Sequence, residues 1–297
     1  MFKIMHIPVL QKEVLEYFDP KPNENFIDCT TGEGGHTLAL LEKVLPEGKI
    51  LGIDWSEELI KSFNFQVPSS KKNIILVCDN FANLKEIVRR EKFKSISGIL
   101  FDLGMSSWNL EESGRGFSFL RNEPLDMRYN PLNPLTAEKI VNYWSEIEIE
   151  KLLREYGEER FSEEIAQKII QARKFKSIKN TFHLVKIVSD AVPTWYQHKK
   201  MHFATKTFQA IRITVNDELN NLEKVLPQTI EILKSGGRLI IISFHSLEDR
   251  IVKNFYKNQS KNGLIKILTK KPAEPGREEI RINPRSRSAK LRAAVKI

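Results

Sequence analysis

Two acidic residues and a glycine-rich turn near the start of the chain have the types and spacing of a nucleotide-binding site. The segment from Asp28 to His36 reads Asp-Cys-Thr-Thr-Gly-Glu-Gly-Gly-His, and Asp54 follows 19 residues after Gly35. Glycines let a backbone bend sharply and approach a ligand closely. A carboxylate at the tip of the second strand can accept hydrogen bonds from both ribose hydroxyls. This combination predicts a site for an adenine-containing cofactor.

The order of the glycines favours one cofactor over the others. A nicotinamide site usually carries G-x-G-x-x-G, whereas Gly32, Gly34 and Gly35 here follow Asp28 in the order D-x-x-x-G-x-G-G. That order is typical of enzymes that hold the amino acid end of S-adenosylmethionine, and a Walker lysine motif is absent. We therefore predict S-adenosylmethionine as the cofactor, with a nicotinamide oxidoreductase as the least favoured alternative.

The elements that must position these residues alternate between strands and helices before and after a long helical stretch. A lead-in helix is expected within residues 9–18, and short apolar runs are typical of parallel strands buried on both faces. The expected strands lie at about 25–29, 49–53, 73–77, 96–101, 236–244, 264–268 and 291–297. We predict an α/β, Rossmann-like fold with a seven-stranded sheet made by residues 1–111 and 209–297. Residues 112–208 are expected to form an inserted all-helical domain for substrate recognition.

The basic residues are concentrated in two segments. The chain has a formal net charge of +9, while residues 165–215 alone carry +9 and residues 238–297 carry +10. Such segregation indicates a polyanionic partner, most simply nucleic acid, although a solvated lysine-rich surface would look the same. No apolar run approaches the ~18 residues of a membrane span. The two cysteines, Cys29 and Cys78, fit a reducing cytoplasm and are expected to be packing residues.

Several further blocks combine polar and aromatic residues at the ends of predicted elements. They are Asp102 to Ser107, Arg115 to Phe119, Pro124 to Arg128, Thr207 to Ile213, Phe244 to Arg250 and Asn283 to Arg292. With the glycine turn, these blocks closely resemble the bacterial family of 16S ribosomal RNA cytosine-N4 methyltransferases, once called MraW. The resemblance extends from His6 to Arg292, which is nearly the whole chain.

The resemblance implies a fold, a reaction and a set of cofactor contacts. It implies a class I methyltransferase domain with an inserted helical domain, and methyl transfer from S-adenosylmethionine to the N4 amine of a decoding-site cytosine in 16S rRNA. The contacts it implies are Gly34, Gly35, His36, Asp54, Phe81, Asp102 and Asn109. From the residues alone, His36 could also be a helix N-terminal residue without a ligand, and Phe81 could be simple core.

The chemistry of an exocyclic amine sets what the catalytic residues must do. The N4 lone pair of cytosine is delocalised into the ring, so the enzyme must position the nitrogen and accept a hydrogen bond from its N–H. We predict Asp102, Ser106 and His245 for this work, with no metal and no cysteine nucleophile. Two structural alternatives stay open, a helix cap at His245 to Glu248 and an ion pair between Asp126 and an arginine.

Three positions depart from the family pattern, and the substrate leaves alternatives open. Phe203 stands where the family usually has proline, Lys206 where it has arginine, and Asn109 where it often has glutamine. Residues 165–215 and the tail cations Arg281, Arg285, Arg287, Lys290 and Arg292 are expected to bind RNA. The expected partner is 16S rRNA within the small ribosomal subunit, in the cytoplasm and without a membrane, and a homodimer is one option. The alternatives are an exocyclic-amine methyltransferase acting on DNA or other RNA, and a non-catalytic rRNA-binding assembly factor.

Overall fold

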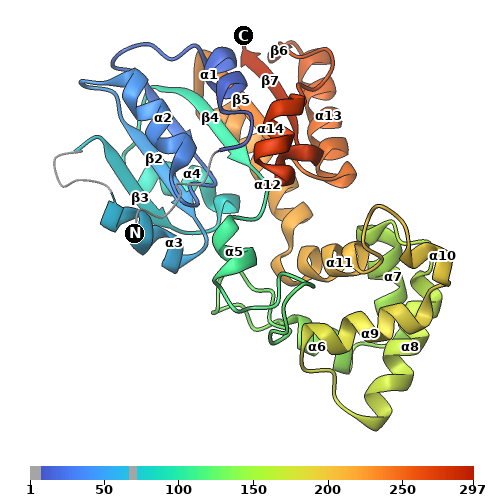
Figure 1. Ribbon diagram of the computed structural model, residues 1–297. Coiled ribbons are helices and arrows are strands. Elements are labelled where there is room, and N and C mark those ends of the chain that lie inside the picture. Colours follow the sequence, from blue (N-terminus) through green and yellow to red (C-terminus); the bar gives the residue numbers. More distant parts are fainter. Residues whose placement is uncertain (1–7, 67–71) are drawn as a thin grey trace. The chain divides into compact units, whose positions relative to one another are not determined.

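A seven-stranded sheet forms the centre of the first of two units into which the chain divides (Figure 1). The computed structural model describes residues 8–66 and 72–297, so His6 lies outside the described residues. The strands are β1 Asn25–Asp28, β2 Ile50–Asp54, β3 Ile74–Cys78, β4 Ile96–Asp102, β5 Leu233–Ser243, β6 Ile265–Ile267 and β7 Lys290–Lys296. Their order is β3-β2-β1-β4-β5-β7-β6; β7 pairs antiparallel with both β5 and β6, and the other pairs among the described strands are parallel. The predicted class I methyltransferase fold is confirmed.

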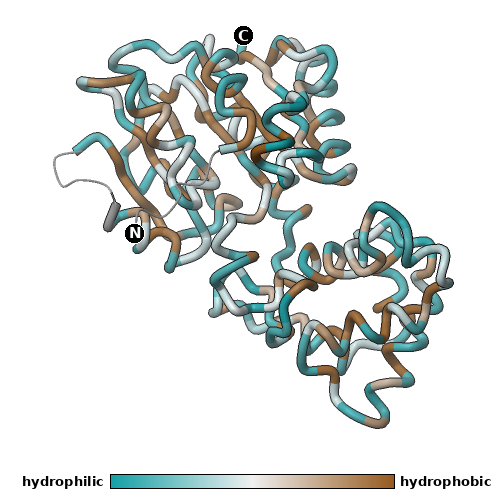
Figure 2. The backbone as a smooth tube through the Cα atoms, in the orientation of Figure 1, coloured by the Kyte–Doolittle hydropathy of each residue, from teal (hydrophilic) through white to brown (hydrophobic). Residues whose placement is uncertain are grey.

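Helices cover both faces of this sheet. The helices of this unit are α1 Gln11–Phe18, α2 Gly35–Val44, α3 Glu57–Gln66, α4 Leu84–Arg90, α12 Glu218–Ile232, α13 Ser246–Lys261 and α14 Arg277–Ile282, with short 3-10 turns η1 Phe81–Asn83 and η2 Pro284–Ser288. One apolar cluster joins the sheet to α4, α12 and α13, and another joins it to α1 and α2. The inner strands β1, β2 and β4 are therefore buried on both faces, as their nearly continuous apolar runs require (Figure 2).

The second unit, Met105–Glu218, is helical and has an apolar core of its own. Its helices are α5 Ser107–Glu111, α6 Ala137–Tyr143, α7 Glu146–Gly157, α8 Ser162–Phe175, α9 Thr181–Ala191, α10 Thr194–Gln197 and α11 Thr205–Asn216. The unit starts earlier and ends later than the predicted 112–208. One reason is that α11 packs closely on α7, where a Cβ on Gly157 would lie 2.9 Å from the Lys206 carbonyl oxygen. No helix in the described part of the chain is long and apolar enough to cross a membrane.

Two helices start at polar N-cap residues. Asn180 caps α9 by accepting the His183 N–H at 2.9 Å. The Thr181 hydroxyl accepts the Glu123 N–H. His245 is the N-cap of α13. Cys29 is buried as expected, but the packing role of Cys78 is wrong, because β3 is an edge strand and the side chain is exposed at its end.

Candidate functional site

The glycine-rich turn joins β1 to α2 and is held in place by Asp28. The buried Asp28 carboxylate accepts hydrogen bonds from the Thr30 N–H at 3.1 Å and the Thr37 hydroxyl at 2.7 Å. Burial raises the pKa of Asp28, while the neighbouring His36 and these hydrogen bonds oppose the rise. Both carboxylate oxygens therefore serve the turn itself. Thr30 and Thr37 were missed from the sequence, although threonines near an aspartate are a usual sign of such local hydrogen bonding.

Gly34 has two separate reasons to be glycine. Its φ is +85°, in the left-handed region that side chains rarely adopt. A Cβ at this position would also lie 2.0 Å from a ring carbon of Phe63, which comes from α3. The turn therefore passes directly over an aromatic ring, and nothing in the sequence spacing pointed to Phe63 as the residue that shapes it.

Asp54 links the end of β2 to the same turn. Its carboxylate accepts the Gly32 N–H and the Ser56 N–H, both at 2.8 Å. A carboxylate has about four acceptor positions, so acceptor capacity remains for the ribose hydroxyls. Burial raises the pKa of Asp54 to about 6, and the hydrogen bonds from Ser56 and Gly32 limit the rise.

This raised pKa makes cofactor affinity depend on pH. The ionised carboxylate accepts hydrogen bonds from hydroxyls better than the acid does, so affinity should be highest above pH 6. At pH 5 only about a tenth of Asp54 is ionised, and calorimetry should give a dissociation constant for S-adenosylmethionine about tenfold weaker than at pH 7.5. Asp54→Asn should bind weakly with a flatter profile, which separates Asp54 from Asp28. Equal affinity of the wild type at both pH values would contradict the assignment.

The same group has the opposite effect on the stability of the protein without cofactor. The folded-state pKa of about 6 lies above the ordinary value of about 4. Protonated Asp54 therefore stabilises the fold below pH 4, and this contribution is lost as the pH rises through 6. A ligand that binds only when Asp54 is ionised therefore opposes the preference of the folded protein for protonated Asp54.

His36 and Asp102 form a cluster of buried polar atoms at the carboxyl end of β4. The Asp102 N–H donates to the Thr30 hydroxyl at 2.7 Å, and the Asp102 Oδ2 lies 3.6 Å from the His36 Nε2. Within residues 8–66 and 72–297, both ring nitrogens of His36 and the Asp102 Oδ1 are buried without a hydrogen-bond partner. A buried polar atom left unpaired costs about 1–3 kcal/mol, so the cluster points to a ligand. An acceptor beside an imidazole suits a molecule with both ammonium and carboxylate groups, as in the amino acid end of S-adenosylmethionine.

Phe81 and Asp79 follow β3 and belong mainly to the local structure. The partly buried Phe81 packs edge-on against Phe101, with ring centroids 5.6 Å apart. Asp79 accepts hydrogen bonds from the Asn80 N–H and the Asn83 side chain and pairs with Arg90. The exposed part of the Phe81 ring remains the candidate adenine contact. The hydrogen bonds of Asp79 stabilise the turn in which it lies.

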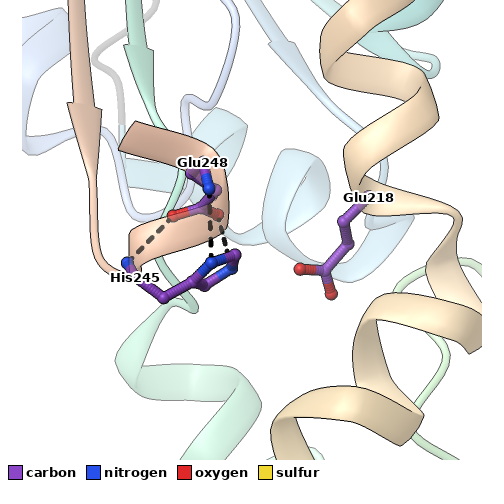
Figure 3. Close-up of side chains that lie close together, drawn as sticks. All are labelled: Glu218, His245 and Glu248. Carbon is purple, nitrogen blue, oxygen red and sulfur yellow. Dashed lines mark hydrogen bonds and ion pairs between the residues drawn. The ribbon is translucent and has the colours of Figure 1, made fainter. Parts of the chain in front are cut away.

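His245 and Glu248 form a capping box at the start of α13 (Figure 3). The His245 Nδ1 accepts the Glu248 N–H at 3.4 Å, and the buried Glu248 carboxylate accepts the Phe244 N–H at 2.8 Å. The His245 Nε2 lies 3.2 Å from Glu248 Oε1, but the contact lacks the direction of a hydrogen bond. The cap that the sequence left open is therefore present, and His245 is part of it. Glu218, also drawn in Figure 3, belongs to the helical unit, where it forms a bidentate pair with Arg212.

Ser106 and Asn109 lie together at the start of the helical unit. Ser106 is the N-cap of α5 and accepts the Asn109 N–H at 3.1 Å. The Asn109 side-chain oxygen contacts the Ser106 hydroxyl, and Asn109 is only 2% exposed. The Asn109 Nδ2 is buried without a partner in the described chain. Asn109 therefore offers a donor, as a ligand contact requires, although it is one methylene shorter than glutamine.

The loop before α6 is held by arginines that serve structure. Arg128 forms a bidentate pair with Asp126, at 2.7 and 2.8 Å, and also donates to two loop carbonyl oxygens. Arg115 donates to the carbonyl oxygens of Arg128 and Tyr129. The ion pair between Asp126 and an arginine, which the sequence left open, is therefore present.

Phe203 and Lys206, the two departures from the family pattern near α11, each make contacts that hold the local structure. His202 stacks between Phe119 and Phe203, with ring centroids at 4.5 and 4.2 Å, so aromatic stacking holds the loop where the family has proline. Lys206 donates to the Glu158 carbonyl oxygen at the C-terminal end of α7, at 2.6 Å. A cation there is favoured by the unpaired carbonyls of the helix end, so Lys206 has a structural role.

One predicted RNA contact in the tail is wrong. Arg292 is nearly buried in β7 and forms a bidentate pair with Asp249 of α13, at 2.7 and 3.1 Å. The guanidinium therefore joins the sheet to a helix and does not face a phosphate. Arg281, Arg285 and Arg287 are exposed, as RNA contacts must be.

Removing Arg292 should destabilise the fold, because it leaves the Asp249 carboxylate nearly buried. Arg292→Ala should lower the free energy of unfolding by about 3 kcal/mol in urea, with Lys290, 4.0 Å from Asp249, limiting the loss. The exposed Arg287→Ala is the matched control and should change it by less than about 0.5 kcal/mol. An Arg292→Ala protein as stable as the wild type would show that the pair contributes nothing.

The chain has relatives among known proteins. Residues 3–297 match the MraW methylase family. A ribosomal RNA small subunit methyltransferase H from Persephonella marina is 45% identical over 99% of this chain and 100% of its own length. A protein of the same name from Thermosipho melanesiensis is 46% identical over 98% of this chain and 98% of its own length. A solved rRNA methylase from Streptococcus thermophilus has a TM-score of 0.46 and 12% identity, over 100% of this chain and 99% of its own. The full-length family match shows that this chain belongs to the MraW methylase family.

Proposed function

We propose that this protein transfers a methyl group from S-adenosylmethionine to the N4 amine of a decoding-site cytosine in 16S rRNA. Membership of the MraW family and the names of relatives matched along their full length support the reaction. The observation that carries the proposal is the buried, unpaired cluster of His36 and Asp102 at the carboxyl edge of the sheet. Ligands bind at that edge in open α/β sheets.

We assign the cofactor to the first unit on the basis of its polar groups. Asp54 has acceptor positions for the ribose hydroxyls, and His36 with Asp102 suits the amino acid end. Gly34 and Gly35 bring the backbone close to it, and Phe81 flanks the adenine. When bound, S-adenosylmethionine supplies the electrophilic methyl group.

The residues of the chain have to orient a weak nucleophile. An N4–H hydrogen bond to Asp102 draws the amine toward tetrahedral geometry and frees its lone pair. The Asp102 carboxylate has enough acceptor positions to serve both the cofactor and the target amine. Ser106 and His245 are both helix N-caps, so we assign them to positioning. Burial raises the pKa of the Cys29 thiol well above its usual value, which fits the absence of a covalent step.

The experiment must compare free 16S rRNA with the assembled small subunit as substrate. We propose the assembled small subunit, because the target cytosine lies in structured rRNA and must be presented to the site. Radiolabelled methyl transfer should be measured with unmethylated small subunits, protein-free 16S rRNA and duplex DNA. Label should enter the subunits and not the DNA. No label in either ribosomal substrate would favour the non-catalytic assembly factor, and label in DNA alone would favour the DNA enzyme.

A further inference from the structure

A half-exposed tryptophan on the helical unit has two cations close to its ring. Trp195, in the short helix α10, is 51% exposed. The Lys199 ammonium lies 4.8 Å from its ring centroid, and the Arg160 guanidinium carbon lies 5.8 Å from it. Neither cation takes part in the cofactor site described above. About half of the indole is therefore open to a partner while two cations lie close to it.

The cluster is rigid because a buried acid joins its two segments. Glu159 is 3% exposed and accepts hydrogen bonds from the Phe161 N–H and the Tyr196 hydroxyl, each at 3.0 Å. Phe161, Trp195 and Tyr196 then pack edge-on against one another, with centroids 5.0 to 6.0 Å apart. Burial beside Glu159 raises the pKa of Tyr196, so its hydroxyl remains a donor. Trp195 is thus held in one orientation before any partner binds.

The charges around the ring select the partner. Residues 191–216 contain Lys199, Lys200, Lys206 and Arg212 and no acidic residue. Lys206 and Arg212 are used within the fold, whereas Arg160, Lys199 and Lys200 are exposed. An aromatic face beside exposed cations matches an unpaired nucleobase with its phosphates, since bases stack on aromatic rings and phosphates pair with Lys and Arg.

We propose that Trp195 stacks an unpaired base of the rRNA substrate, while Arg160 and Lys199 contact the adjacent phosphates. The inference rests on the proposed function and names a recognition point for that substrate. A nucleobase can replace one cation over the ring, because that cation can then pair with an adjacent phosphate. We call Trp195 with Arg160 and Lys199 the platform. It contributes RNA affinity and positions the RNA, and it does not touch the reacting atoms.

Substitutions at Trp195 test the proposal through RNA affinity. Trp195→Ala should weaken binding of protein-free 16S rRNA in filter assays at least tenfold, as stacking on an aromatic side chain is worth about that much. It should raise KM for the RNA and leave kcat unchanged. Trp195→Phe keeps a ring and should lose less. Lys199→Ala should reduce the slope of log affinity against log salt by about 1.

Phe175 supplies the matched control, because it is an exposed aromatic between lysines in the same unit. It is 92% exposed and lies between Lys174 and Lys176, but carries no such cluster. Phe175→Ala should bind RNA as the wild type does. Trp195→Phe should also reduce the quenching of tryptophan fluorescence by RNA, because it leaves only Trp55, Trp108 and Trp144 to report. Circular dichroism of each variant checks that the helices remain.

Three results would overturn the proposal. They are unchanged RNA affinity in a folded Trp195→Ala protein, an equal loss in Phe175→Ala, or a loss for assembled subunits but not for free RNA. The last result would assign the platform to a ribosomal protein. Methyl transfer by the wild type, measured in the same samples, reports on the proposed function separately, because affinity can be compared even if no methyl group is transferred.

Discussion

Asp102→Asn should reduce methyl transfer at least about 100-fold, the usual effect of losing one preorganised electrostatic contact in an active site. The substitution keeps the size of the side chain and removes the charge that faces His36 Nε2 at 3.6 Å. It also replaces one carboxylate oxygen by an amide donor, so the ability to accept from the target amine and the cofactor ammonium is halved. Steady-state kinetics and calorimetry with S-adenosylmethionine should both show the loss.

The controls for Asp102→Asn separate chemistry from folding. The Asp102 N–H bond to the Thr30 hydroxyl comes from the backbone, so the turn should keep its position and the thermal midpoint should change little. Ser97→Ala, at the other end of the same strand, should leave kcat unchanged. Activity within about threefold of the wild type, far short of the 100-fold expected for a lost electrostatic contact, would remove Asp102 from the mechanism.

Gly34→Ala should abolish measurable cofactor binding. The added methyl group would lie 2.0 Å from the Phe63 ring, and the φ of +85° is strained for alanine. Strain alone costs about 1–2 kcal/mol, whereas the collision forces the turn or the ring to move. Because Gly32 of the same turn donates to Asp54, a shift disturbs the ribose site as well. Calorimetry should find no heat of binding for S-adenosylmethionine.

Gly263→Ala is the matched control for the backbone strain that alanine causes at a positive φ. Gly263 has a φ of +71° in the same unit, and nothing lies within 4 Å of the position of its Cβ. Its substitution should lower stability by the strain alone and leave cofactor affinity intact. A Phe63→Ala change combined with Gly34→Ala should recover part of the affinity by making room. If Gly34→Ala binds the cofactor like Gly263→Ala, the close approach to Phe63 has no part in the site.

The sheet and the order of its acids could be predicted from the sequence because both follow from short-range patterns. Seven apolar runs gave the seven strands. Asp28, Asp54 and Asp102 each end a strand, and the carboxyl ends of parallel strands meet at one edge. Their shared location therefore needed no knowledge of contacts. The partner that shapes the turn, Phe63, comes from a different helix and left no mark in the spacing.

The remaining differences come from contacts distant in sequence. Arg292 looked like a phosphate contact in a basic tail, but its partner Asp249 lies 43 residues away. Lys206 lies beside Glu158 only because α11 packs on α7. Such contacts are tertiary and are not visible in composition.

The most direct test of the central claim is mass spectrometry of 16S rRNA nucleosides from cells with and without this protein. The account predicts that N4-methylated cytidine from the decoding site is present in wild-type cells and missing when the gene is deleted. A plasmid with the wild-type gene should restore it, and one encoding Asp102→Asn should not. An unchanged level of N4-methylated cytidine after deletion would contradict the proposed function.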